Sequence, residues 1–327
     1  MNTNRQQILK WQQQGHIDNN DIDKALIITE SNNPPKAWYD FISQSILWLA
    51  VLSIAFGVIF FFAYNWNEIT KLTKFILIQG LMLISLLTYS QTKTSTHANT
   101  AVLFFLALLI GSLFALFGQT YQTGKDPWQL FFIWAVCITP LALTSRSSSL
   151  WLLWLALVNL TLYLYLGVRF GLLGLLFDHE RQVLFYAFVN VSAAAMFEYL
   201  YHSKYKLLNN RIVVQVALLA SMFCFSWIAL YYIFESKKHG LDIVFYLIWM
   251  GAVYFLYRVK TIDVLVLTAW VVSCIMFALA MLARVIKSDL DGGTFLLFSL
   301  LIVGLSTIGI KWLMSILKEI KQKGDVS

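Results

Sequence analysis

The chain has 327 residues, of which 59% are hydrophobic and only 13% are charged, and its mean hydropathy is +0.69. A water-soluble domain carries about 25% charged residues, so this chain has too few polar side chains to cover a globule in water. The net charge of +7 lies on residues that flank apolar segments, which favours a role in membrane topology over nucleic-acid binding. The composition therefore predicts an integral membrane protein.

The first 40 residues form the only long hydrophilic segment, and they are expected to fold as a short helical hairpin on the cytoplasmic face. Trp11 lies in the first helix, and Gly15 is expected to cap its C-terminus because glycine adopts the left-handed conformation at little cost. Asp18 or Asn20 is expected to cap the N-terminus of the second helix. The segment lacks the apolar run of a cleavable signal peptide, so the first span is expected to act as an uncleaved signal anchor.

Ten apolar segments follow Pro34-Pro35, the pair that is expected to end the hairpin. A span needs about 20 residues, and it must be helical because lipid offers the backbone no hydrogen-bond partners. The expected spans are residues 43–64, 72–90, 99–118, 127–144, 148–168, 182–200, 212–234, 241–257, 262–283 and 293–314. Arg169 interrupts the region 165–180, where residues 171–177 could form a re-entrant piece, so nine or eleven spans stay open as alternatives.

The predicted fold is all-α and has three parts: the hairpin over 1–40, a polytopic transmembrane helical bundle over 41–317, and a polar cytoplasmic tail over 318–327. Lysine and arginine are enriched in cytoplasmic loops. With the N-terminus inside, nine of the 24 basic residues fall on the outer face, namely Lys71, Lys74, Lys125, Arg169, Arg181, Lys237, Lys238, Arg284 and Lys287. The other 15 fall on the inner face, so both termini are expected in the cytoplasm.

No predicted span has an ionisable residue near its middle, where such a group commonly marks an ion or proton pathway. Glu198 comes nearest, and it is expected to reach water at the inner end of its span or to pair with a nearby base such as Lys204 or Lys206. The polar side chains in the middle of the spans either hydrogen-bond between helices, which is the favoured interpretation, or line a polar pore. They are Ser53, Gln79, Ser112, Thr139, Asn159, Asn190, Gln215, Thr268, Ser273 and Ser306.

Metal-binding and catalytic patterns are missing from the sequence. Cys137, Cys224 and Cys274 sit singly in apolar stretches, and the five histidines lie in different loops without ligand spacing. The segment 289–293 resembles only the opening of a calcium loop and lacks the later ligands, so a turn is favoured there. The sequence therefore predicts no metal, no cofactor and no catalytic residue.

The richest polar region is predicted at the outer ends of the first and third spans. Its residues are Asn65, Trp66, Glu68, Gln119, Tyr121, Asp126 and Trp128. Amides and aromatic rings can form a shallow ligand-binding site through hydrogen bonds and stacking. The alternative, which is the favoured interpretation, is an aromatic belt with amides that cap the loops. We call this set the outer-face cluster.

The sequence resembles a bacterial family of predicted membrane proteins known as domain of unknown function 2157. The resemblance rests on Trp11-x-x-x-Gly15-His16-Ile17, on Asn65-Trp66 after the first span, and on Gln119-Thr120-Tyr121 after the third. It covers roughly residues 1–145. The resemblance implies a bacterial inner membrane and supplies no activity, substrate or catalytic residue.

Three functional classes stay open. The favoured class is a non-catalytic envelope protein that acts as a partner or assembly factor for another membrane protein. The second is a transporter or channel for a neutral or lipid-like solute, and a central cavity would favour it. The third is an enzyme that acts on a lipid-linked substrate, with Glu68 and Asp126 as a carboxylate pair. The expected partners are membrane lipids and, for the favoured class, another membrane protein, but not nucleic acid.

Overall fold

A computed structural model of the chain has helices and no strands among the residues that it describes, and ten of its helices are long and apolar enough to cross a membrane. It describes residues 8, 10–18, 21–22, 24–25, 34–65, 68–91, 97–121, 126–168, 179–203, 208, 210–235, 240–286 and 292–324. Each of the ten expected spans coincides with one of these helices. The prediction of an all-α polytopic bundle is therefore confirmed. The proposed re-entrant piece at 171–177 lies outside the described residues.

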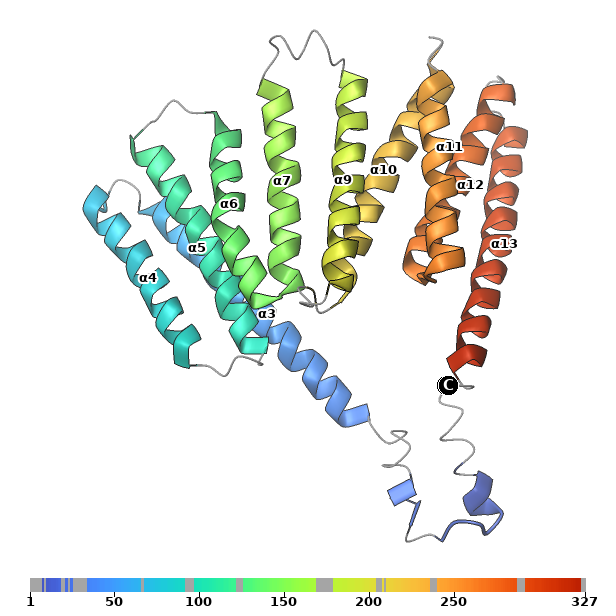
Figure 1. The fold of residues 1–327 in the computed structure, drawn as a ribbon, viewed down its shortest axis with the longest axis horizontal. Coiled ribbons are helices and arrows are strands. Elements are labelled where there is room, and N and C mark those ends of the chain that lie inside the picture. Colours follow the sequence, from blue (N-terminus) through green and yellow to red (C-terminus); the bar gives the residue numbers. More distant parts are fainter. Residues whose placement is uncertain are drawn as a thin grey trace. The chain divides into compact units, whose positions relative to one another are not determined.

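The helices are labelled as in Figure 1. They are α3 (Pro34–Tyr64), α4 (Lys71–Gln91), α5 (His97–Tyr121), α6 (Pro127–Ser145), α7 (Ser148–Val168), α9 (His179–His202), α10 (Ile212–Phe234), α11 (Gly240–Tyr254), the π-helix η1 (Phe255–Lys260), α12 (Val264–Ile286) and α13 (Gly292–Gly324). The helix α13 continues through most of the segment expected as a polar tail, so residues 318–324 are helical.

The chain divides into two compact units, Met1–Leu113 and Phe114–Ser327, and the boundary falls within α5. In the first unit, Trp48 of α3 packs edge-on against Phe104 of α5, with ring centroids 5.4 Å apart. The amide nitrogen of Gln44 lies 3.1 Å from Nε2 of His97, at the beginning of α5. An aromatic contact and a polar contact thus join α3 to the part of α5 that belongs to this unit.

The C-cap predicted at Gly15 is confirmed. Gly15 has φ +72°, its N–H donates to the carbonyl of Gln12, and the N–H of His16 donates to the carbonyl of Trp11, both at 2.9 Å. These two bonds are the Schellman pattern that ends many helices. Pro34 begins α3, nine residues before the expected start of the first span, because proline fits the first turn of a helix, where no intrahelical donor is needed.

The second unit is built around α10, which packs against α7, α9, α11 and α12. Its residues Val213, Val214 and Ala217 are fully buried. The last helix, α13, packs against α12, and a Cβ atom on Gly309 would lie only 2.6 Å from Cγ1 of Val271. The absence of a side chain at Gly309 therefore permits the close approach of these two helices.

Paired amides join α7 to α9 deep within the second unit. The side-chain nitrogen of Asn190 donates to Oδ1 of Asn159 at 2.7 Å, and that of Asn159 donates back to Oδ1 of Asn190 at 3.2 Å. Each amide also donates to a carbonyl one turn earlier in its own helix, on Leu155 or Tyr186, at 2.9 Å. All four amide N–H groups thus have an acceptor within the protein.

Hydroxyl and indole groups join other helix pairs in the same way. The hydroxyls of Ser226 in α10 and Ser273 in α12 lie 2.7 Å apart, and the hydroxyl of Tyr246 in α11 lies 3.0 Å from that of Ser273. The indole N–H of Trp154 in α7 donates to the hydroxyl of Thr139 in α6 at 3.0 Å. Interhelical hydrogen bonding, the favoured interpretation of the polar residues within spans, is therefore confirmed for these positions.

We expect Asn159→Ala and Asn190→Ala each to lower the free energy of unfolding by about 1–3 kcal/mol, because each leaves a buried amide without its partner. The double variant should lose less than the sum of the two, by about 0.6–1.7 kcal/mol. Denaturant-induced unfolding in detergent micelles measures all three. Thr268→Ala is the control, because that hydroxyl bonds a carbonyl of its own helix on an exposed face. Strictly additive losses would contradict the paired role.

Candidate functional site

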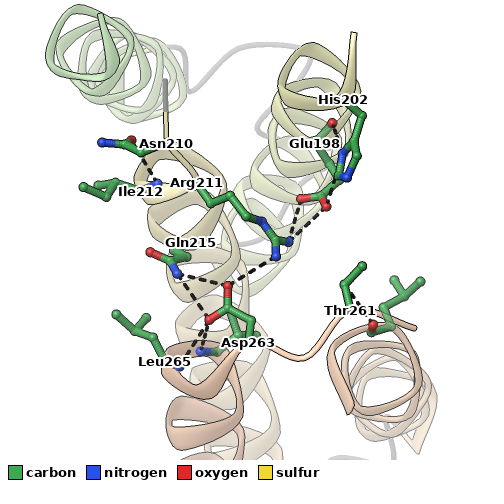
Figure 2. Close-up of polar contacts among 11 residues, drawn as sticks. Glu198, His202, Asn210, Arg211, Ile212, Gln215, Thr261, Asp263 and Leu265 are labelled. Carbon is green, nitrogen blue, oxygen red and sulfur yellow. Dashed lines mark hydrogen bonds and ion pairs between the residues drawn. The ribbon is translucent and has the colours of Figure 1, made fainter. Parts of the chain in front are cut away.

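A group of charged and polar side chains gathers where α9 ends and where α10 and α12 begin (Figure 2). It consists of Glu198, Arg211, Gln215 and Asp263, and we call it the Arg211 cluster. Glu198 lies in the last turns of α9, Arg211 directly precedes α10, and Asp263 directly precedes α12. Three helices separated along the chain thus meet through these side chains.

Arg211 holds Glu198 with its guanidinium group. Its Nη2 atom donates to both carboxylate oxygens, at 3.0 and 3.1 Å. The two side chains are only 20% and 25% exposed, so water screens the pair less than it would a surface ion pair. Glu198 thus pairs with a nearby base, as one of its two expectations had it, and that base is Arg211; Lys204 and Lys206 lie outside the described part of the chain.

Asp263 is the most buried charge of the cluster, with 6% of its side chain exposed. The amide of Gln215 donates to its two oxygens at 3.2 and 3.0 Å, and the backbone N–H groups of Leu265 and Val266 donate to Oδ1. The two backbone bonds are an N-cap, in which the carboxylate satisfies free donors at the start of α12. Nη1 of Arg211 adds an ion pair at 3.8 Å.

Two tyrosine rings enclose the guanidinium group of Arg211. Its central carbon lies 5.8 Å from the ring centre of Tyr201 and 5.7 Å from that of Tyr257, which is within cation–π range. Tyr257 belongs to η1, whose wider turn ends α11. The next residue, Arg258, donates to both oxygens of Glu319 in α13, at 3.0 and 3.1 Å. Neighbouring residues of η1 thus connect the cluster to α11 and α13.

The contacts of the cluster join the ends of α9, α10 and α12. Asp263 accepts four hydrogen bonds besides its ion pair, and Glu198 accepts two from Arg211. Carboxylates that are engaged in this way hold helices together in a fixed arrangement. Within the residues that the structure describes, histidine, cysteine and acidic side chains nowhere gather in a group of three that could hold a metal ion.

The residues of the predicted outer-face cluster make contacts within their own helix or with the helix that follows it. The amide of Asn65 donates to the carbonyl of Phe61 at 2.9 Å, and the indole of Trp128 donates to the carboxylate of Asp126 at 3.4 Å. The ring of Trp128 packs on Tyr165, and that of Tyr121 packs on Phe117. These contacts match the alternative of capping amides and packed aromatic rings.

The two halves of the outer-face cluster belong to different units of the chain. Asn65 and Glu68 are in the first, and Gln119, Tyr121, Asp126 and Trp128 are in the second. Glu68, Gln119 and Tyr121 are exposed, and Trp66 lies outside the described residues. A joint ligand-binding site at these positions stays a prediction.

Sequence reasoning did not single out Arg211 and Asp263. Asp263 stands directly before an apolar run, which is the pattern of a helix N-cap, and that signal could have excluded it from the interior of a span. Arg211 stands directly before another apolar run, and its charge contributed only to the predicted orientation in the membrane. Their pairing could not be found from spacing, because 52 positions separate them in the chain.

Comparison with known proteins supports the membrane assignment. Residues 9–151 match the family described as "Predicted membrane protein (DUF2157)", which confirms the resemblance found in the sequence. The match ends near the start of α7, so the Arg211 cluster lies beyond it. No curated protein and no solved structure matches the chain.

We expect Arg211→Met to lower the free energy of unfolding by about 2–4 kcal/mol, because it leaves the Glu198 carboxylate partly buried without its donor. Glu198→Gln combined with Arg211→Met should restore part of that stability, since both charges are then gone. Unfolding in detergent measures the variants. Arg284→Met, at an exposed site in the last turn of α12, is the matched control. Equal losses in Arg211→Met and Arg284→Met would show that the cluster contributes no stability.

Proposed function

We propose that this protein is a non-enzymatic partner or assembly factor for another membrane protein. The observation that carries the proposal is that several polar side chains in the middle of the spans of the second unit are hydrogen-bonded between helices. Asn159 with Asn190, and Ser273 with Ser226 and Tyr246, hydrogen-bond between helices. A pathway for a polar solute needs side chains that are free to bind that solute, and these are already engaged in holding the bundle together.

The outward surface of the spans supports the same proposal. The helix α13 stands against α12 on one side, and its other side is strongly exposed. Leu296, Leu300 and Val303 are 69%, 76% and 65% exposed. Aliphatic side chains on such a face can contact either lipid tails or the spans of another protein. An assembly factor needs an accessible intramembrane face of this kind.

Location and orientation form part of the proposal. The matched family consists of predicted membrane proteins, and we place this member in the inner membrane of a bacterium. Fifteen of the 24 lysines and arginines fall on the side of the N-terminus if the ten helices alternate in direction. The positive-inside bias therefore favours cytoplasmic N- and C-termini.

A reporter fusion tests the orientation. Alkaline phosphatase fused after Ser327 should be inactive, because the enzyme becomes active only after export to the periplasm. The same reporter fused after Thr70, between α3 and α4, should be active and is the matched control. An active fusion after Ser327 would place the C-terminus outside and refute the orientation.

Photo-crosslinking in cells tests the proposed role. A photoreactive residue at Leu300 or Val303 should give a crosslink to one defined membrane protein. The same residue at Ile316, which is fully buried in the same helix, should give none. The captured protein should also fall in abundance or fail to assemble when the gene for this chain is deleted.

Two results would overturn the role. If the photoreactive residue formed adducts with lipid alone at every exposed position, the proposed protein partner would be refuted. A captured protein whose amount and assembly are unchanged in the deletion strain would remove the assembly function. Solute flux through purified protein in liposomes would favour the transporter instead, and turnover of a lipid-linked substrate that depends on Glu68 and Asp126 would favour the enzyme.

A further inference from the structure

Three aromatic rings contact one another in the second unit, near the end where the Arg211 cluster lies. Tyr254 lies 5.2 Å from Trp270 and 6.2 Å from Trp312, and the two tryptophan rings are 6.0 Å apart, between ring centroids. The indole N–H of Trp270 donates to the carbonyl of Met250 at 2.9 Å. Tryptophan and tyrosine concentrate at the boundary between hydrocarbon and headgroups, so the rings place this boundary close to them.

The charges beyond these rings are unequal in sign. Glu319, the acidic residue of α13 beyond the rings, is neutralised by Arg258 at 3.0 Å. Lys318 directly precedes Glu319 in sequence, Lys260 lies two residues after Arg258, and both lysines are exposed. Neither forms an ion pair within the described residues. The ion pair thus neutralises Glu319 and leaves the exposed lysines as the unpaired charges described at the ends of η1 and α13.

The end of α13 also has apolar side chains exposed beside Lys318. The helix continues from Glu319 to Gly324, a rise of about 7.5 Å at 1.5 Å per residue. Lys321 and Lys323 belong to this last part of the helix. Leu317 and Ile320, on either side of Lys318, are 43% and 37% exposed. Apolar side chains beside exposed ammonium groups match the boundary between lipid tails and phosphate headgroups.

We propose that the ends of η1 and α13 form a binding surface for the headgroups of anionic phospholipids. The lysine ammonium groups at positions 260 and 318 donate hydrogen bonds to lipid phosphate oxygens, and Arg258 keeps Glu319 from repelling them. A zwitterionic headgroup carries its own cation beside the phosphate, so the surface selects anionic lipid. This inference concerns lipid contact and is independent of the proposed protein partner.

Short-range fluorescence quenching in reconstituted vesicles tests the proposal. The three native cysteines are replaced by alanine, and a fluorophore is attached through Gln322→Cys, an exposed site on α13. Quenching by spin-labelled phosphatidylglycerol is compared with quenching by spin-labelled phosphatidylcholine, each as a minor component of phosphatidylcholine vesicles. Enrichment of the anionic lipid should fall roughly fivefold for each lysine removed in Lys260→Gln/Lys318→Gln. It should also collapse in 1 M salt, where the screening length is about 3 Å.

The control is Lys71→Gln/Arg284→Gln. This variant also removes two positive charges, but from exposed positions in α4 and α12, outside η1 and α13. This control variant should keep the enrichment of the original chain. Equal enrichment of both lipids in the original chain would overturn the proposal. An equal loss in the two double variants would also overturn it, because net charge and not this surface would then attract the lipid.

Discussion

Hydrocarbon offers no hydrogen-bond partner to an amide or a hydroxyl, so a polar group within a span must find its partner in the protein. This constraint organises the second unit. Asn159 and Asn190 satisfy each other across α7 and α9 and use their remaining donors on carbonyls of their own helices. Such a pair holds in only one register of the two helices, so it fixes their relative position as well as stabilising their contact.

The charged residues obey the same constraint at a different depth. A charge costs least near a helix end, and Glu198, Arg211 and Asp263 all lie at ends of α9, α10 and α12. Asp263 does not depend on Arg211 alone, because Gln215 and the first turn of α12 also donate to it. Arg211 therefore serves chiefly to hold Glu198, while Asp263 shapes the start of α12 and keeps that helix beside α10.

Length and hydropathy predicted the spans because lipid imposes both on every helix independently. The C-cap at Gly15 was predictable for a similar reason, since a positive φ is a local property of one residue. The partner of Glu198 was not, because it depends on how α9 and α10 pack. Spacing favoured nearby lysines, whereas packing supplied Arg211. The outer-face cluster illustrates the same limit: Asn65 and Gln119 were grouped by their equivalent places after two spans, and the chain assigns them to different units.

These observations separate the residues that hold the bundle from those that are available to a partner. Asn159, Asn190 and Ser273 are paired between helices inside the second unit. At one of its ends, Glu198, Asp263 and Glu319 form ion pairs with arginines. An aliphatic face on α13 and the lysines beside it are among the side chains that stay accessible. An aliphatic face can pack against a surface of complementary shape within the membrane. Lysines can bind negatively charged groups at the membrane surface. Because both occur on α13, and the paired amides join α7 to α9, α13 can engage its surroundings without disturbing those hydrogen bonds.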